Sequence, residues 1–281
     1  MDLKKWTEKI IKDFIDNSPV NRLGNGTEEK SWTEFLIGFA NGADQIFQDY
    51  KQHVGEFHWT PQEIFNETFP DQPAEAEELT VISYILPQTE ATKIDHRKEK
   101  NRPAERWART RIFGEKFNTE LHRHLVETFM EAGIQATAPT LTKNWKMHQS
   151  PQFVYASCWS QRHAAHAAGL GTFGLCDGLI TPKGKAMRAG SIIVRAKITP
   201  TPRLYQHHQA YCLFYAKGTC KECVERCPVG ALSEEGHDKV KCREFLAKVT
   251  TKYVKEHLGF DGYGCGLCQV GVACESGIPE G

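Results

Sequence analysis

The chain carries the stretch Cys220-Lys-Glu-Cys223-Val-Glu-Arg-Cys227-Pro228, in which three cysteines stand three and four residues apart and a proline follows the last. Eight of its ten cysteines lie beyond residue 211, at Cys212, Cys220, Cys223, Cys227, Cys242, Cys265, Cys268 and Cys274. A reduced intracellular chain with a core of this size needs no disulfides, so this density indicates metal binding or catalysis. All six tryptophans, by contrast, lie between Trp6 and Trp159. The asymmetry predicts a larger domain with an ordinary core, followed by a small domain held together by inorganic chemistry.

The cysteine spacing matches the back end of a bacterial ferredoxin run, in which three cysteines bind one [4Fe–4S] cube and the one before proline reaches a second cube. The first cysteine of that run would fall at Lys217, so we expect Cys212 to return over a longer loop as the missing ligand. The pattern Cys265-x2-Cys268-x5-Cys274 and the separate Cys242 complete eight thiolates, the number that two cubes require. In this ferredoxin pattern the cysteine before proline crosses over to the other cube. The crossover predicts two sets of ligands: Cys212, Cys220, Cys223 and Cys274 for one cube, and Cys227, Cys242, Cys265 and Cys268 for the other.

Zinc is the main alternative, since two CxxC pairs can also form a zinc site, but a zinc ribbon would leave Cys227, Cys242 and Cys274 without a role. Clusters can also serve only to hold a domain together. Two adjacent cubes, however, indicate a path for electrons toward a site in the first two hundred residues.

Composition and charge limit the partners of the chain. Its 281 residues include 35 Lys and Arg against 35 Asp and Glu, and a formal charge of zero argues against binding nucleic acid or anionic membranes by bulk electrostatics. No apolar run approaches the roughly 20 residues of a spanning helix, and the charged first eight residues contain no signal core. We therefore expect a cytoplasmic protein with no membrane partner.

The hydrophobic pattern predicts an α/β (α+β) fold in three parts: an N-terminal helical region over residues 1–75, an α/β domain over 76–205 and a cluster domain over 206–281. Helical spacing predicts helices over 2–16 and 31–54, a long helix from Pro103 to Gly133, and a helix over 158–168. Apolar runs predict strands over 79–86, 134–138, 178–181 and 191–198.

A glycine-rich motif, Gly169-Leu-Gly171-Thr-Phe-Gly174, matches the GxGxxG pattern of dinucleotide sites. Such a site needs a strand before the motif and a helix after it, whereas here a helix precedes and a strand follows, so we reject NAD binding. A helix cap explains Gly169 alone, and close approach of backbone to a large flat ligand explains all three glycines. Between Asp177 and Glu222 there are eight Lys and Arg and no acidic residue. These charges indicate either a solvated face, or compensation of anionic clusters, a phosphate-bearing cofactor or an acidic substrate.

Together, Ala168-Gly-Leu-Gly-Thr-Phe-Gly174, Leu179-Ile-Thr-Pro-Lys-Gly184, Gly190-Ser-Ile-Ile-Val194 and the cysteine clusters resemble the superfamily of epoxyqueuosine reductases and reductive dehalogenases, from about Leu79 to Cys274. The resemblance implies a nitroreductase-like, corrinoid-binding α/β domain followed by a ferredoxin-like 2[4Fe–4S] domain, with cobalt(I) performing the reductive step. It also implies corrinoid contacts at Gly169, Leu170, Gly171, Thr172, Phe173, Gly174, Leu179, Ile180, Thr181 and Pro182.

The proton donor departs from the pattern of both subfamilies. The acidic donor of the tRNA-modifying reductases aligns with Lys116, with Glu115 next to it, and the tyrosine of the dehalogenases could correspond to Tyr84 or Tyr155. His163 precedes the glycine motif and is a further candidate, although histidines in such positions are more often structural. Because few residues follow Cys274, we expect neither the helical-repeat domain of the tRNA-modifying enzymes nor a tRNA partner.

We therefore expect an iron–sulfur, cobalamin-dependent reductase of a small organic substrate, with a low-potential donor such as ferredoxin or flavodoxin supplying electrons. The alternatives are an electron-transfer or corrinoid-reactivating protein without substrate chemistry of its own, and a cluster protein whose pocket binds another ligand.

Overall fold

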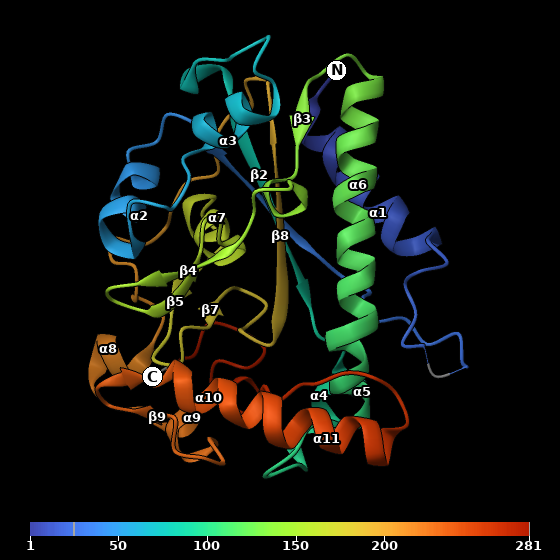
Figure 1. Cartoon of the computed structure of the whole chain (residues 1–281), viewed down its shortest axis with the longest axis vertical. Coiled ribbons are helices and arrows are strands. Elements are labelled where there is room, and N and C mark those ends of the chain that lie inside the picture. Colours follow the sequence, from blue (N-terminus) through green and yellow to red (C-terminus); the bar gives the residue numbers. More distant parts are fainter. Residues whose placement is uncertain (25, 281) are drawn as a thin grey trace.

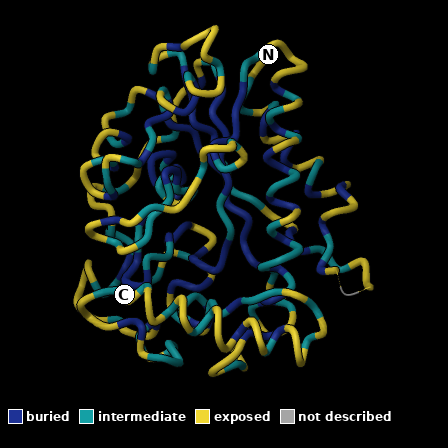
Figure 2. Tube along the Cα trace, in the orientation of Figure 1, coloured by how far each residue is buried: buried dark blue, intermediate teal, exposed yellow. Residues whose placement is uncertain are grey.

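A four-stranded sheet in the order β1-β2-β8-β3 forms the centre of the molecule, with every neighbouring pair antiparallel. The computed structural model describes residues 1–24 and 26–280. The strands of this sheet are β1 (Leu36–Asn41), β2 (Thr80–Pro87), β3 (Ala136–Thr137) and β8 (Met187–Val194). All eight residues of β2 are buried, because helices cover both faces of the sheet (Figure 2).

Helices on the two sides of the sheet enclose two separate apolar cores (Figure 1). On one side, α1 (Leu3–Asn17) and α6 (Glu115–Glu131) bring Ile11, Phe117 and Leu121 against Ile82 and Ile192. The other side is covered by α2 (Ile46–Val54), α3 (Pro61–Thr68) and α7 (Gln161–Ala167). The structure therefore has three layers, and its helices and antiparallel sheet confirm the predicted α/β (α+β) fold class.

Shorter elements complete the larger part of the chain. They are the helices α4 (Glu90–Arg97) and α5 (Glu105–Arg109), a π-helical turn at Thr110–Gly114, the hairpin of β4 (Met147–Ser150) and β5 (Val154–Ser157), and the hairpin of β6 (Thr172–Phe173) and β7 (Leu179–Ile180). None of the helices in residues 1–24 and 26–280 has both the length and the apolar character needed to cross a bilayer.

The C-terminal part runs across one end of the sheet, drawn in orange and red in Figure 1. Its elements are α8 (Leu213–Lys217), α9 (Glu222–Glu225), β9 (Leu232–Ser233), β10 (Gly236–His237), α10 (Lys239–Phe245) and α11 (Thr251–Tyr253), with π-helical turns at Leu246–Thr250 and Val254–Leu258. The last segment returns to the sheet domain: the backbone N–H groups of Lys185 and Ala186 donate to the carbonyls of Cys274 and Glu275 at 2.9 and 3.2 Å. The buried Glu275 carboxylate also pairs with Arg97. These contacts fix the cysteine-rich part against the start of β8.

One predicted element is wrong. The single helix expected over residues 31–54 is instead β1, a turn and α2, so the N-terminal region contributes an edge strand to the central sheet. A strand forms because Leu36–Asn41 pairs with Thr80 to Ile85 of β2. Gly38 also lets the Ala168 carbonyl approach, since a Cβ there would lie 2.3 Å from its oxygen. Tertiary pairing here overrides a helical spacing of apolar residues.

Candidate functional site

The structure divides the eight C-terminal cysteines between two cavities, in the same two sets of four that the crossover predicts. Cys212, Cys220, Cys223 and Cys274 line a small cavity with Lys185 and Ile180, and we call these cysteines set A. Cys212 comes just before α8 and Cys274 follows the last short helical turn, so both ends of this part of the chain meet there. Cys212, Cys223 and Cys274 are buried, and Cys220 is half-buried.

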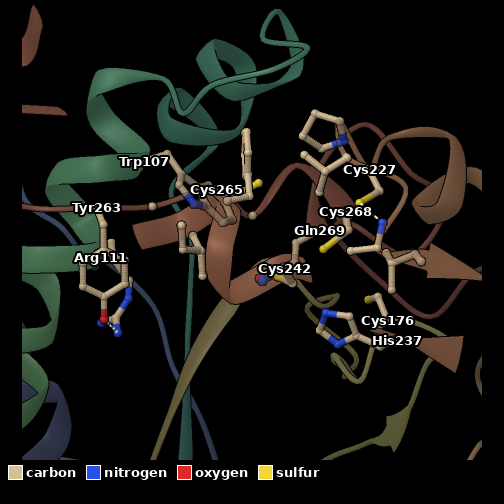
Figure 3. A pocket seen from close by; sticks show the side chains of 18 of the residues that line it. Trp107, Arg111, Cys176, Cys227, His237, Cys242, Tyr263, Cys265, Cys268 and Gln269 are labelled. Atoms are coloured by element: carbon tan, nitrogen blue, oxygen red, sulfur yellow. Dashed lines mark hydrogen bonds between the residues drawn. The ribbon is translucent and has the colours of Figure 1, made fainter. Parts of the chain in front are cut away.

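Cys227, Cys242, Cys265 and Cys268, here called set B, line a second cavity of about 220 Å³ (Figure 3). Cys227 follows α9 and Cys242 lies in α10, whereas Cys265 and Cys268 flank the turn at Gly266. Gly266 has a φ of 67°, and a Cβ there would lie 2.0 Å from the Trp107 ring, so only glycine fits between the two cysteines. Cys176 lines this second cavity as a fifth cysteine. Each set of four thiols matches in number the donors that a [4Fe–4S] cube requires.

A ninth thiol and a buried lysine lie between the two sets. Cys176 follows the glycine motif, and its sulfur is within hydrogen-bonding reach of Cys223 from set A and Cys268 from set B. The Lys185 ammonium donates to the same sulfur at 3.4 Å. The side chains of Cys176 and Lys185 therefore occupy the boundary between the two cavities.

The largest cavity, about 550 Å³, lies between α2, the β4–β5 hairpin and α7. Aromatic and histidine side chains dominate its wall, which includes Tyr50, His53, Phe153, Tyr155, His163, His166, Phe173, His208 and Tyr215. Tyr50 shares a hydrogen bond of 2.7 Å with His166 Nδ1, and His163 Nδ1 bonds to Ser160 Oγ at 2.8 Å. His166 Nε2 is buried and has no hydrogen-bond partner among the described residues. A ligand in this cavity would meet flat aromatic and imidazole rings.

His163 and His166, two histidines of this cavity, are neutral near pH 7. Burial lowers the pKa of His166 to about 3, and burial holds the pKa of His163 well below its usual value. Burial likewise raises the pKa of Tyr50 well above 10, so the phenol stays protonated. Where Tyr50, His163 and His166 line it, the cavity therefore presents hydrogen-bonding groups that carry no charge.

Charged residues form the wall between the large cavity and the set B cavity. Arg162 lines both, Asp177 and Lys239 line the large cavity, and His237 lines the other together with Cys242. Asp177 Oδ2 is 3.1 Å from His237 Nδ1 and 3.5 Å from Lys239 Nζ. The side chains of Arg162, Asp177 and His237 thus connect the wall of the large cavity with that of the set B cavity.

The glycine motif contributes less to the large cavity than we expected. Phe173 and Gly174 line it, and Ile180 lines the set A cavity, but Gly169, Leu170, Gly171, Thr172, Leu179, Thr181 and Pro182 line none of the cavities described above. A Cβ at Gly169 would lie 2.9 Å from the Pro202 carbonyl oxygen, and one at Gly171 would lie 2.2 Å from that of Ile180. The close approach predicted from these glycines is made to protein backbone, not to open space for a ligand.

This packing role predicts different effects for two glycines of the motif. Gly171→Ala is expected to lower the free energy of unfolding by about 1–3 kcal/mol, because its methyl group would collide with the backbone of β7. Gly174→Ala is the control, since its Cβ would meet the movable Ile180 Cδ1 at 3.2 Å. Urea unfolding of both variants measures the difference, and equal stabilities would contradict it.

The structure places the proton-donor candidates in three different environments. Tyr84 is completely buried in β2 and donates to Asn118 Oδ1 at 2.8 Å, so it cannot reach a ligand in any of the cavities described. Glu115 lies 3.4 Å from both Arg111 and Arg188, and Lys116 lies over the Phe113 ring. Glu115 and Lys116 lie on an open groove beside α6, and neither lines the large cavity.

Two candidates do lie on the wall of the large cavity. Tyr155, in β5, packs against Arg243 of α10, whose guanidinium is 4.9 Å from the ring centroid. His163, in α7, lies between the rings of Tyr50 and Phe173. Tyr155 and His163 stay candidates for a role toward a bound ligand.

Sequence reasoning missed Tyr50, Asp177 and His237. Tyr50 belongs to the segment predicted as one long helix, and Asp177 and His237 are sixty residues apart with no motif joining them. A sequence signal existed for Asp177, which is the last acidic residue before the basic stretch. The structure adds that its φ is 58°, uncommon for a residue other than glycine.

Comparison with known proteins finds relatives in sequence and in fold. No family model matches the chain. An epoxyqueuosine reductase of Bacillus anthracis is 31% identical over 115 residues, which are 39% of this chain and 28% of that protein. A crystal structure of an epoxyqueuosine reductase with a modified tRNA-Tyr stem loop superimposes over 99% of this chain and 67% of its own, with a TM-score of 0.51 and 15% identity. A catabolic reductive dehalogenase covers 87% of this chain, with a TM-score of 0.49 and 14% identity.

The resemblance to epoxyqueuosine reductases inferred from the motifs is therefore confirmed at low identity, and the chain has the fold of an epoxyqueuosine reductase. The matched segment spans less than a third of the curated relative. One expectation needs correction: the exclusion of tRNA as a partner loses its support, since one of the similar structures holds a tRNA stem loop.

Proposed function

We propose that the chain is an iron–sulfur reductase in which sets A and B each bind a [4Fe–4S] cluster and pass single electrons to an acceptor in the large cavity. The segregation of eight cysteines into two sets of four on adjacent cavities carries this proposal. The similarity to enzymes named reductases supports it. A low-potential donor such as ferredoxin or flavodoxin would supply the electrons.

A corrinoid is the acceptor that the resemblance implies. When bound, it would supply a low-valent cobalt centre for the reductive step. The flat side chain of Phe173 and the backbone of Gly174 lie on the wall of the large cavity and fit such a group. In this assignment His163 and Tyr155 orient a small organic substrate and hold protons near it, and the buried, neutral rings around them exclude water.

The packing of the glycine motif favours a second candidate. Most of the residues expected to contact the corrinoid are packed against protein backbone or lie in the core. The large cavity can instead hold an organic ligand that receives electrons directly from the clusters. The chain would then be a cluster reductase or electron-transfer protein without a corrinoid.

Anaerobic reconstitution with iron and sulfide, followed by hydroxocobalamin and desalting, distinguishes the two candidates. We expect about eight irons per chain and one retained corrinoid, detected by its visible spectrum. Ala156→Trp fills the large cavity and is expected to lose the corrinoid but keep the iron, whereas the exposed Ala91→Trp keeps both.

Each outcome decides one part of the proposal. Retention of iron without corrinoid would refute the corrinoid and leave the second candidate. Corrinoid retained equally by Ala156→Trp would place it outside the large cavity. Binding of zinc in place of iron would refute both candidates.

A further inference from the structure

Lys185 lies at the start of the segment that enters β8 and is almost completely buried, with 3% of its surface exposed. Its backbone N–H donates to the Cys274 carbonyl, which fixes it beside set A. Its ammonium donates to Cys176 Sγ at 3.4 Å. The next groups that face it are the thiols of Cys274 and Cys223 from set A and of Cys268 from set B. The charge is therefore held between the two sets of cysteines.

A buried ammonium needs a compensating negative charge, because removing it from water costs several kcal/mol. Within residues 1–24 and 26–280 no carboxylate forms an ion pair with Lys185, and the strongest charge interactions of its ammonium are with cysteine sulfur atoms. Each set of four thiolates would bring four negative charges to its cavity. A loaded pair of clusters would supply the charge that this lysine lacks in the polypeptide alone.

We propose that Lys185 is a fixed cation shared by the two clusters, and that it raises the reduction potential of both. Reduction adds one electron to a cluster and breaks no bond, so a nearby positive charge stabilises the reduced form by direct attraction. Low dielectric around the buried ammonium makes this attraction stronger than at the surface. The inference rests on the proposed clusters and adds the residue that sets how readily they accept electrons.

A matched control stands two residues earlier. Lys183 carries the same charge on the same turn, but its side chain is exposed and paired with Glu34 at 2.6 Å. Water and this carboxylate screen it, so its removal is expected to leave the clusters unchanged. Comparing Lys185→Met with Lys183→Met therefore distinguishes the effect of losing the buried charge from the effect of losing any one positive charge.

The test is an anaerobic redox titration of both variants and of Lys185→Arg, followed by electron paramagnetic resonance, with iron measured in each sample. For Lys185→Met we expect each one-electron reduction equilibrium to become at least tenfold less favourable, about 59 mV. Lys183→Met and Lys185→Arg should stay within threefold of the unaltered protein. Full iron with unshifted potentials in Lys185→Met overturns the proposal, and so does an equal shift in Lys185→Arg.

The outcome is also informative if Lys185→Met fails to assemble clusters. Lys185→Gln provides a second neutral side chain, and the titration is then made on it. If both neutral variants lose iron while Lys185→Arg keeps it, the need for the positive charge is supported. Loss of iron in all three variants would assign Lys185 a packing role and overturn the proposal. An unaltered protein that binds no iron would instead refute the proposed function.

Discussion

Replacing Cys274 by serine is expected to remove the same iron–sulfur cluster as replacing Cys220, although the two cysteines lie at opposite ends of the cysteine-rich segment. Both thiols line the set A cavity, and Cys227, much closer to Cys220 in sequence, lines the set B cavity. Each single replacement should lower the iron content by one to four atoms per chain, as the cube is lost or changes to a three-iron form. Iron analysis and the electron paramagnetic resonance signals of the reduced protein measure the effect.

Double replacements test which cysteines bind the same cluster. Changing Cys220 and Cys274 together should cost no more than one cluster, since both serve the same cube. Changing Cys220 and Cys227 together should cost both clusters. Cys158→Ser is the control: Cys158 is buried, accepts from the backbone N–H of Lys146 at 3.3 Å and lines neither cysteine cavity, so all iron should remain. Equal loss in the two double variants would refute the division into sets.

The motif from Cys220 to Pro228 is readable in the sequence because ligand spacing in a short segment reflects local geometry. A proline after Cys227 and a two-residue gap between Cys220 and Cys223 limit where the chain can turn, whatever the rest of the molecule does. The buried strand β2 and the long α6 are predictable for a related reason, since apolar periodicity over many residues leaves few alternatives. These features depend on neighbours in sequence.

Features that depend on distant partners were not predictable. Leu36–Asn41 has no strong strand signal of its own and becomes β1 because it pairs along β2. Gly171 could serve a ligand or a neighbouring strand, and only the fold shows that the Ile180 carbonyl occupies the space beside it. The wall of the large cavity likewise combines Tyr50, His163 and Lys239 from three separate segments. No pattern of spacing connects such residues before the sheet brings them together.

Acidification between pH 6.5 and pH 4 is expected to destabilise the protein through His122. This side chain is buried in α6, and its Nε2 accepts a hydrogen bond from the backbone N–H of Ser191 in β8 at 3.1 Å. Burial lowers its pKa to about 4, from about 6.5 in an unfolded chain. In this pH range the unfolded chain therefore binds a proton that the folded protein does not.

The free energy of unfolding must then fall as the pH falls, because proton binding favours the state that takes up the proton. The contribution is fully present above pH 6.5 and is lost progressively toward pH 4, and a shift of this size amounts to about 3 kcal/mol. Urea unfolding at pH 7, 6 and 5 measures the slope. His122→Gln keeps an acceptor for Ser191 without a titrating ring and should make that slope shallower by the contribution of one group, because His163 and His166, whose pKa values burial also lowers, still contribute to it. If His122→Gln and the unaltered protein lose stability in parallel on acidification, the proton taken up on unfolding belongs to another group, and the contact between α6 and β8 is insensitive to pH.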